Sequence, residues 1–382
     1  MKGMLVQWAV ACSHMILLAQ VVAAAPVSGI TAAASIDPTS NYLADAKRVV
    51  EAAARPAAAW AGPRSGPRAQ GGKRIAVVNE DLRNGGILAV DEGVLEAAKV
   101  MGWTVKVFDS GGTPEGRKKM LADAMDSRPD GLIVLGGDAR ALAPWLQQFA
   151  ERGIPIVGWH VAARAGPVPG TPVAMNVSTD PLEVARVTAL AAIVQSGGHA
   201  GVIVFSDTNY ELPRTKAEAM AEVVRGCAGC TLLEVRDVAI SRNAELMPGT
   251  TRALLARYGR RWTHALAIND IYFDYAAPVL TQAALPNGAL SMLSAGDGSE
   301  SAFLRIRTGS FQTATVAEPL NLHGWQLVDE MNRLLAGEPV TNTVFAVHLV
   351  TADNVDADGG DRLLYDPANG YRDIYRRIWR RP

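Results

Sequence analysis

The chain has 382 residues, of which 37 are Lys or Arg and 38 are Asp or Glu, so its formal net charge is −1. This balance offers no electrostatic footprint for nucleic acid, which argues against a nucleic-acid-binding protein. A chain of this length is too long for one ordinary core and predicts two domains.

The first 26 residues have the three parts of a secretory signal: a positive charge at Lys2, an apolar run, and a small-residue exit at Val22-Ala23-Ala24. We therefore expect residues 1–24 to be a cleaved signal peptide and the mature protein to be periplasmic. A membrane anchor is disfavoured because polar residues interrupt the run at positions 12–14. Lipid attachment at Cys12, in the sequence Ala-Val-Ala-Cys, is a further alternative, disfavoured by the short apolar segment before it.

Residues 25–72 are rich in Ala, Pro, Gly and Ser, with one short helical stretch predicted over Tyr42–Ala54. This composition predicts a leader or linker outside the main core. Regular structure is expected to begin at Lys73.

From Lys73 onward, apolar runs alternate with amphipathic helical stretches, as is typical of parallel βαβ units. The first series of runs is RIAVVN, TVKVFD, GLIVLG and PIVGWH, and the second is GVIVFSD, TLLEVRDV, HALAIND and LSMLSAGD. The runs are continuously apolar because strands of a parallel sheet are buried on both faces. The pattern predicts an α/β fold with two doubly wound parallel-sheet lobes and a break near Asn176.

Cys227 and Cys230 are separated by Ala228-Gly229 in a predicted helix-to-strand turn. In an oxidising compartment this pair predicts a local structural disulfide. A redox-active dithiol is the alternative, but no thioredoxin-like pattern flanks the pair.

Polar residues follow most of the predicted strands, and ligands of open parallel sheets bind beyond the carboxyl ends of strands. Each such residue could instead be a helix cap or turn former, so the prediction depends on the group. Trp159 and Tyr210 are the aromatic side chains expected near the cleft. The polar strand-end residues are Asn79, Glu80, Asp81, Asn84, Asp138, His160, Ser206, Asp207, Asn269, Asp270 and Asp297.

Residues 73 to about 350 resemble the type I periplasmic binding proteins of the ribose and galactose kind, which serve sugar ABC importers. The resemblance runs through KRIAVVNEDLRNGG, IPIVGWH, NVSTDPLEVAR, PRTKAEAMAEVV, LAINDIYF, SAGDGSESAFLRIRTG and TATVAEPLNLHGWQLVDEMNRLLAG. It implies a hinge of three crossovers near Asn176, Glu318 and His348. The implied lobes are 73–176 plus 319–348 and 177–318 plus 349–360, followed by a tail at 361–382.

The resemblance places ligand-binding roles on Asn84, His160, Arg214, Asn269, Asp297 and Glu318, and strand-end reasoning adds Asp81, Trp159 and Tyr210. Three departures from the family pattern matter. His160 and Val161 replace an Asp-Arg pair, Glu318 replaces a Gln, and Gly86-Ile87 stand where stacking aromatics are usual.

These features predict the exported solute-binding subunit of an ABC importer, a monomer that works with an inner-membrane permease. The ligand is expected to be a sugar, a polyol or a related polar solute. Arg214 against Asp297 and Glu318 makes the pocket near neutral or slightly acidic, which favours a neutral polyol or a ligand carrying an amine over an anion. A protein that docks to a membrane sensor kinase or chemoreceptor is the alternative. No catalytic residue, metal ligand or cofactor is predicted, since dinucleotide, phosphate-loop, zinc and nucleophile-elbow motifs are missing from the sequence.

The tail contains YRDIYRRIWRRP, which predicts a basic amphipathic helix with Tyr371, Ile374, Tyr375, Ile378 and Trp379 along one side. We favour packing of this apolar side against a lobe over binding to a membrane surface.

Overall fold

The computed structural model describes residues 38–56, 59–286 and 288–381. The expected signal peptide, Cys12 and the leader residues up to 37 therefore lie outside the described part. Within the described residues, no helix combines the length and the apolarity that crossing a membrane requires.

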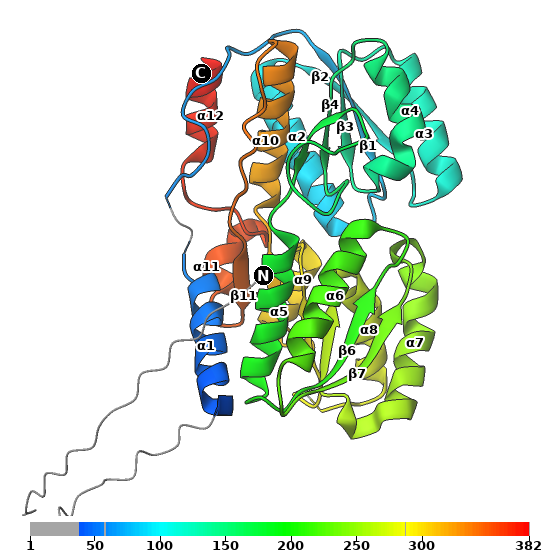
Figure 1. The fold of residues 1–382 in the computed structure, drawn as a ribbon, viewed down its shortest axis with the longest axis vertical. Coiled ribbons are helices and arrows are strands. Elements are labelled where there is room, and N and C mark those ends of the chain that lie inside the picture. Colours follow the sequence, from blue (N-terminus) through cyan, green and yellow to red (C-terminus); the bar gives the residue numbers. More distant parts are fainter. Residues whose placement is uncertain (1–37, 57–58, 287, 382) are drawn as a thin grey trace, which may run out of the picture. The chain divides into compact units, whose positions relative to one another are not determined.

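The N-terminal lobe is built on a parallel five-stranded sheet of order β2-β1-β3-β4-β5, drawn in the upper half of Figure 1. Its central strands are buried on both faces, whereas the edge strand β2 is largely exposed. One face packs against α2 and α10 and the other against α3 and α4. The elements are β1 (Arg74–Asn79), α2 (Gly85–Met101), β2 (Thr104–Asp109), α3 (Pro114–Asp126), β3 (Gly131–Leu135), α4 (Ala139–Ala150), β4 (Ile156–Trp159), β5 (Val173–Val177) and α10 (Leu320–Leu335).

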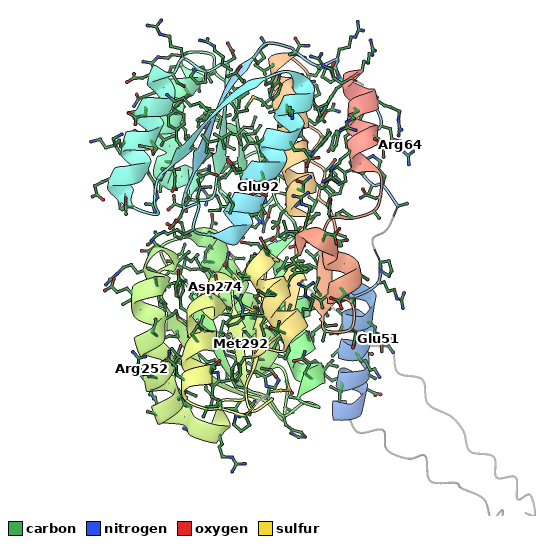
Figure 2. All side chains as sticks on the ribbon, turned by 180° about the vertical axis from the view of Figure 1, so that it is seen from behind. Glu51, Arg64, Glu92, Arg252, Asp274 and Met292 are labelled. Carbon is green, nitrogen blue, oxygen red and sulfur yellow. A yellow bond between two sulfur atoms is a disulfide. The ribbon has the colours of Figure 1, made fainter. Side chains whose placement is uncertain are left out.

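The C-terminal lobe has a six-stranded sheet of order β11-β10-β9-β8-β6-β7, parallel except for the edge strand β11. Met292, labelled in Figure 2, lies on β9 at the centre of this core. The two lobes confirm the predicted α/β fold. The elements are α5 (Pro181–Gln195), β6 (Gly201–Ser206), α6 (Glu211–Arg225), β7 (Thr231–Asp237), α7 (Asn243–Tyr258), β8 (His264–Ala267), α8 (Ile271–Gln282), β9 (Ser291–Ser294), α9 (Glu300–Thr308), β10 (Gln312–Ala317), β11 (His348–Thr351) and α11 (Val355–Gly359).

The chain passes between the lobes after β5, after β10 and before β11, as a hinge of three crossovers requires. Two further passages occur near the ends of the described chain. Helix α1 (Pro38–Ala53) packs on α5 of the C-terminal lobe, and Trp60 then enters the core of the N-terminal lobe. Tyr365 belongs to an apolar cluster of the C-terminal lobe, and α12 (Tyr371–Trp379) returns to the N-terminal lobe.

Residues 25–72 were expected to lie outside the core. The described part of this segment instead packs against both lobes. The Trp60 ring lies 5.3 Å from the rings of both Phe345 and Tyr375. The backbone N–H of Gln70 donates to Asn332 at 2.8 Å, and its carbonyl accepts from Trp103 Nε1 at 2.6 Å. The composition of this segment suggested a linker because small residues and prolines dominate it. One large aromatic side chain and hydrogen-bonded backbone groups are nevertheless enough to hold the segment against the lobe.

Helix α12 packs its apolar side against the N-terminal lobe. This is the arrangement that the sequence favoured over binding to a membrane surface. Tyr371, Tyr375, Ile378 and Trp379 are buried. The Trp379 ring stacks on Trp325 of α10, with ring centroids 5.4 Å apart. Arg64, on the segment that leads to β1, lies beside this helix (Figure 2).

The disulfide between Cys227 and Cys230 is present, as predicted, with 5.3 Å between the two Cα atoms. It closes the turn between α6 and β7. Cys227 is buried against Ala46 of α1 and Leu190 of α5. The bridge therefore lies where the N-terminal helix docks onto the C-terminal lobe.

Candidate functional site

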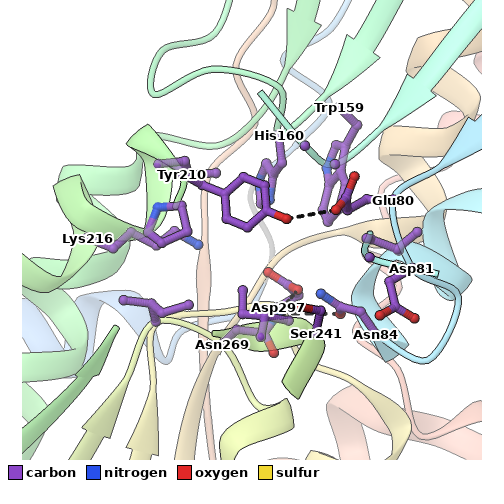
Figure 3. A pocket seen from close by; sticks show the side chains of 18 residues that line it. Glu80, Asp81, Asn84, Trp159, His160, Tyr210, Lys216, Ser241, Asn269 and Asp297 are labelled. Carbon is purple, nitrogen blue, oxygen red and sulfur yellow. Dashed lines mark hydrogen bonds between the residues drawn. The ribbon is translucent and has the colours of Figure 1, made fainter. Parts of the chain in front are cut away.

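A cavity of about 80 Å³ lies where the carboxyl ends of the two parallel sheets face each other. Both lobes contribute its walls (Figure 3). This is the position at which open parallel sheets bind ligands, since the loops diverge there and helix N-termini point outward. The lining residues are Glu80, Asp81, Asn84, Ile87, Gly112, Gly136, Gly137, Trp159 and His160 from the N-terminal lobe, and Tyr210, Leu212, Pro213, Lys216, Ile240, Ser241, Ile268, Asn269 and Asp297 from the C-terminal lobe.

The structure brings most of the residues singled out in the sequence to this cavity. Those that line it are Glu80, Asp81, Asn84, Trp159, His160, Tyr210, Asn269 and Asp297. Glu318 lies directly behind the wall, fully buried, and contacts His160.

Arg214 does not line the cavity, and its side chain is exposed on α6. Lys216, two residues later, lines the cavity instead and is 3% exposed. Two residues correspond to roughly 200° of rotation around a helix, so both side chains cannot face the same side. The buried cation of the site is therefore Lys216. Sequence reasoning missed it because the rotation of α6 about its axis is set by packing.

A buried charge cluster, consisting of Lys216, Glu318, His160 and Asp297, forms the base of the site. The two oxygens of Glu318 have different partners: Oε2 lies 3.0 Å from His160 Nε2, and Oε1 lies 3.5 Å from Lys216 Nζ. Lys216 also donates to the carbonyl of Ala295 at 2.8 Å. Burial opposes ionisation of Glu318, but the charges of His160 and Lys216 outweigh it and hold its pKa well below the usual range.

Asp297 is the carboxylate of the cluster without a close cationic partner. It is 4% exposed and accepts a hydrogen bond of 2.6 Å from Asn269 Nδ2. Burial raises its pKa to about 6, against the lowering effect of Lys216 and His160. A ligand that donates hydrogen bonds would satisfy this carboxylate.

His160, Asp297 and Glu318 each offer a metal-ligating atom, and these atoms lie within 4.8 Å of one another. The donor atoms of His160 and Glu318 are already directed at each other, and the Lys216 ammonium occupies the other side of Glu318. Positive charge is thus supplied by the chain itself, and the contacts are those of a hydrogen-bonded ion cluster.

Asn84 serves both as a helix cap and as part of the wall. Its Oδ1 accepts from the backbone N–H of Gly86 at 3.0 Å, which caps α2. Asn269 of the other lobe donates to the same oxygen at 3.4 Å. The cap and site interpretations, which were alternatives in the sequence, both apply to this residue.

The Trp159 and His160 rings stack on each other with centroids 3.8 Å apart. Trp159 Nε1 donates to Nδ1 of the fully buried His323 at 3.1 Å, and burial lowers the pKa of His323 to about 4. His323 therefore stays neutral at physiological pH and can accept this bond. The result is a fixed aromatic wall on the N-terminal lobe.

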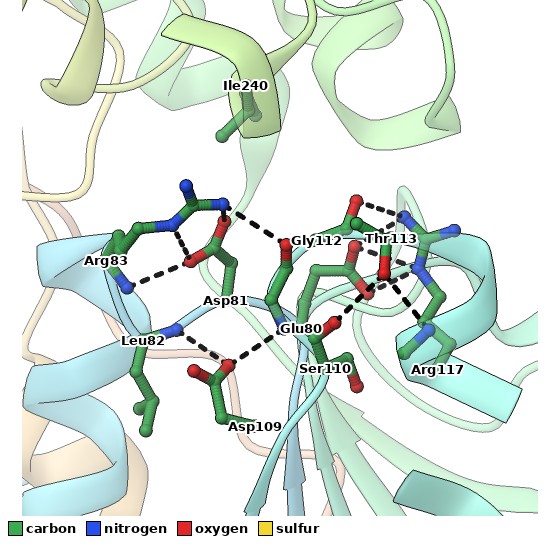
Figure 4. Close-up of polar contacts among 12 residues, drawn as sticks. Glu80, Asp81, Leu82, Arg83, Asp109, Ser110, Gly112, Thr113, Arg117 and Ile240 are labelled. Atoms are coloured by element: carbon green, nitrogen blue, oxygen red, sulfur yellow. Dashed lines mark hydrogen bonds and ion pairs between the residues drawn. The ribbon is translucent and has the colours of Figure 1, made fainter. Parts of the chain in front are cut away.

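A rim cluster of Glu80, Arg117 and Tyr210 joins the two lobes at the mouth of the cavity. Arg117 Nε donates to both Glu80 oxygens, at 2.9 and 2.7 Å (Figure 4). Tyr210 of the C-terminal lobe donates from its hydroxyl to Glu80 at 2.7 Å. Arg140 and Glu211 form a second pair across the lobes at 2.9 Å. Arg117 has no distinguishing sequence context, because it sits inside α3 and only the tertiary structure aims it at the rim.

Asp81, also at the mouth, is paired within its own lobe. Arg83 Nη2 lies 2.6 Å from Asp81 Oδ2 (Figure 4). The charges of Glu80 and Asp81 are thus both compensated locally, which leaves Asp297 as the carboxylate available to a ligand.

A family model described as "Periplasmic binding protein domain" matches residues 75–339. No curated protein matches the chain in sequence. Among solved structures, the chain is similar to an ABC transporter solute-binding protein from Agrobacterium vitis bound with alpha-D-tagatopyranose. The two are 17% identical, the match covers 77% of this chain and 99% of the other, and the TM-score is 0.69.

Two further solved structures are similar. A Mycobacterium smegmatis ABC transporter solute-binding protein with bound glycerol is 20% identical, with coverage of 77% and 99% and a TM-score of 0.67. A second Agrobacterium vitis solute-binding protein, with bound allitol, is 19% identical, with coverage of 75% and 97% and a TM-score of 0.65. At these identities the likeness shows the fold.

Proposed function

Since the chain belongs to the periplasmic binding protein family, we propose that it binds a small polar solute, a sugar, polyol or related compound, between its two lobes. The observation that carries this proposal is the cavity between the lobes, where Asp297 and Asn269 of one lobe face His160 and Asn84 of the other. Such a site completes its ligand contacts only when both lobes engage, so binding is coupled to lobe closure.

The charges around the cavity favour a neutral ligand. Lys216 and Glu318 compensate each other, as do Arg117 and Glu80. Asp297 remains as an acceptor for hydroxyl groups, and an anionic ligand would be repelled by it.

We infer that the chain is the periplasmic, monomeric subunit of an importer that passes its ligand to an inner-membrane ABC permease without chemical change. The family match and the sequence features of residues 1–24 support this role. A protein that instead docks to a membrane sensor would use the same cleft. Deleting the gene should abolish uptake of the ligand if the importer role holds, and should leave uptake intact if the role is only in sensing.

Replacing Asp297 by Ala is expected to abolish ligand-induced thermal stabilisation while the unliganded protein stays folded. A hydrogen bond from a ligand to a charged group is worth about 1.5 to 3 kcal/mol. Burial disfavours the ionised form of Asp297, as its raised pKa shows, so removing this carboxylate is not expected to unfold the protein. The measurement is a thermal-shift screen against sugars and polyols. Asp123→Ala, which removes an exposed carboxylate on α3, is the control and should bind like the parent chain. Undiminished binding by the Asp297 variant would refute the site.

Ligand affinity is expected to fall about tenfold between pH 7 and pH 5. The pKa of Asp297 is about 6, so the carboxylate is ionised and accepts ligand hydroxyls at pH 7 but is mostly protonated at pH 5. Titration calorimetry at both pH values measures the change. Lys216, Glu318 and His160 face the same space, so Asp297→Asn is needed to isolate the effect. If the ligand affinity of the Asp297→Asn variant is the same at pH 7 and pH 5, the pH dependence of the parent chain arises from Asp297. If the variant still loses affinity at pH 5, another group is responsible.

A further inference from the structure

We infer that the closed cleft is built for a compact polyol of about three or four carbons, and that Gly85 and Gly86 set this limit by letting the C-terminal lobe approach closely. The inference rests on the proposed function and deepens it by naming the ligand class. It is drawn from the contacts between the lobes and the volume that they leave.

The contact between the two glycines and the loop after β9 is a direct interlobe contact. A Cβ placed on Gly86 would lie 2.2 Å from Asp297 Oδ2 and 2.6 Å from Asp297 Cβ. A Cβ on Gly85 would lie 2.8 Å from the Cβ of Ser299. Any side chain at these two positions would hold the lobes apart, because more than the flexible end of Asp297 would have to move.

A third glycine in the cavity wall repeats the arrangement. A Cβ on Gly112 would lie 2.7 Å from the Cβ of Ser241 of the C-terminal lobe. The rim cluster adds direct hydrogen bonds between the lobes, from Tyr210 to Glu80 at 2.7 Å and from Arg117 to Tyr210 at 2.5 Å. Closure is therefore limited where the glycine backbone meets the Cβ atoms of Asp297, Ser299 and Ser241, which cannot rotate out of the way as the end of a long side chain could.

The cavity between these contacts has a volume of about 80 Å³. This is roughly half of the ~150 Å³ of an engineered cavity that holds a benzene ring. A pyranose ring with its hydroxyl groups is larger than benzene, so enclosing it would require breaking the glycine contacts or the rim cluster. A three- or four-carbon chain fits with modest side-chain adjustment.

The walls also match a short polyol. Ile87, Leu212 and Ile268 offer apolar contact to its carbon chain. Asp297 accepts hydroxyl hydrogens, and Lys216 and Asn269 donate to hydroxyl oxygens. These polar groups lie close together around a small volume, as vicinal hydroxyls on a short chain require.

The first test measures binding of a ladder of polyols to the full chain: glycerol, erythritol, xylitol, sorbitol and glucose, by titration calorimetry. Affinity is expected to be greatest for glycerol or erythritol and at least tenfold lower for sorbitol and glucose. Tight binding of glucose or sorbitol that Asp297→Ala abolishes would overturn the size limit and leave the proposed function standing. If none of the probes binds and no sugar or polyol shifts the melting temperature, both proposals fall together.

The second test replaces Gly86 by Ala and compares it with Gly249→Ala, a helical glycine of α7 with nothing within 4 Å of its added Cβ. The Gly86 variant should bind short polyols at least tenfold more weakly, whereas the Gly249 variant should bind normally. A ligand-independent readout is bridging of the double variant Arg140→Cys, Glu211→Cys by a short bis-maleimide cross-linker, because the tips of the long native side chains at these positions meet across the lobes. Gly86→Ala should reduce this cross-linking several-fold. Equal cross-linking and binding in both glycine variants would overturn the inference.

Discussion

Replacing Lys216 by Met is expected to lower the free energy of unfolding at pH 7 by about 3 to 5 kcal/mol, since removing one partner of a buried ion pair leaves the other charge uncompensated. Lys216 is 3% exposed, and its Nζ lies 3.5 Å from Glu318. The buried Asp297 also loses the favourable interaction with the positive charge of Lys216. Urea denaturation of the unliganded protein measures the change.

The loss should shrink as the pH falls. Without Lys216 the depressed pKa of Glu318 rises and the already raised pKa of Asp297 rises further, so the native variant takes up more protons between pH 7 and pH 5 than the native parent chain does. Stability of the variant relative to the parent chain therefore increases from pH 7 to pH 5. A double variant, Lys216→Met with Glu318→Gln, should recover part of the loss at pH 7 because no unpaired charge remains at that pair.

Arg214→Met is the matched control, because it removes a cation from the same helix two residues away. Because Arg214 is exposed, this substitution should lower the free energy of unfolding by no more than about 0.5 kcal/mol. Similar losses for the two variants would contradict the placement of α6, and a larger loss for Arg214→Met would reverse the assignment of the buried cation.

Replacing Trp379 by Ala is expected to destabilise the protein by about 3 to 5 kcal/mol, the usual cost of deleting a large buried aromatic side chain. Trp379 is 1% exposed, stacks on Trp325 and Tyr375, and donates from Nε1 to Asp329 at 2.7 Å. Asp329 keeps its pairing with Arg333, so its charge stays compensated. Thermal and urea unfolding measure the loss.

Trp379→Phe separates the two contributions of this side chain. It retains most of the buried area and removes the hydrogen bond to Asp329, so a loss of about 1 to 3 kcal/mol is expected. Arg377→Ala, on the exposed side of the same helix, is the control and should be nearly neutral. If Trp379→Ala left stability unchanged, the C-terminal helix would not be an integral part of the N-terminal lobe.

Local features of the sequence were enough to predict the fold class and the disulfide, and most of the predicted ligand-binding residues line the interlobe cavity. Runs such as GLIVLG are apolar throughout because β3 is buried on both faces. Such a run can be recognised in the sequence without knowing which helices and strands pack against it. The strand-end positions of Asn269 and Asp297 predicted a shared edge because parallel strands finish on the same side of a sheet. Cys227 and Cys230 are close enough in sequence for the turn alone to bring them together.

Only the tertiary structure decided which side chains reach the cavity from helices and from the opposite lobe. Lys216 rather than Arg214 is buried because packing sets the rotation of α6. Arg117 meets Tyr210, and Gly86 meets Asp297, across segments distant in sequence and in different lobes. Trp60 and Trp379 became core residues for the same reason, since burial depends on long-range contacts that no local pattern of small or basic residues encodes.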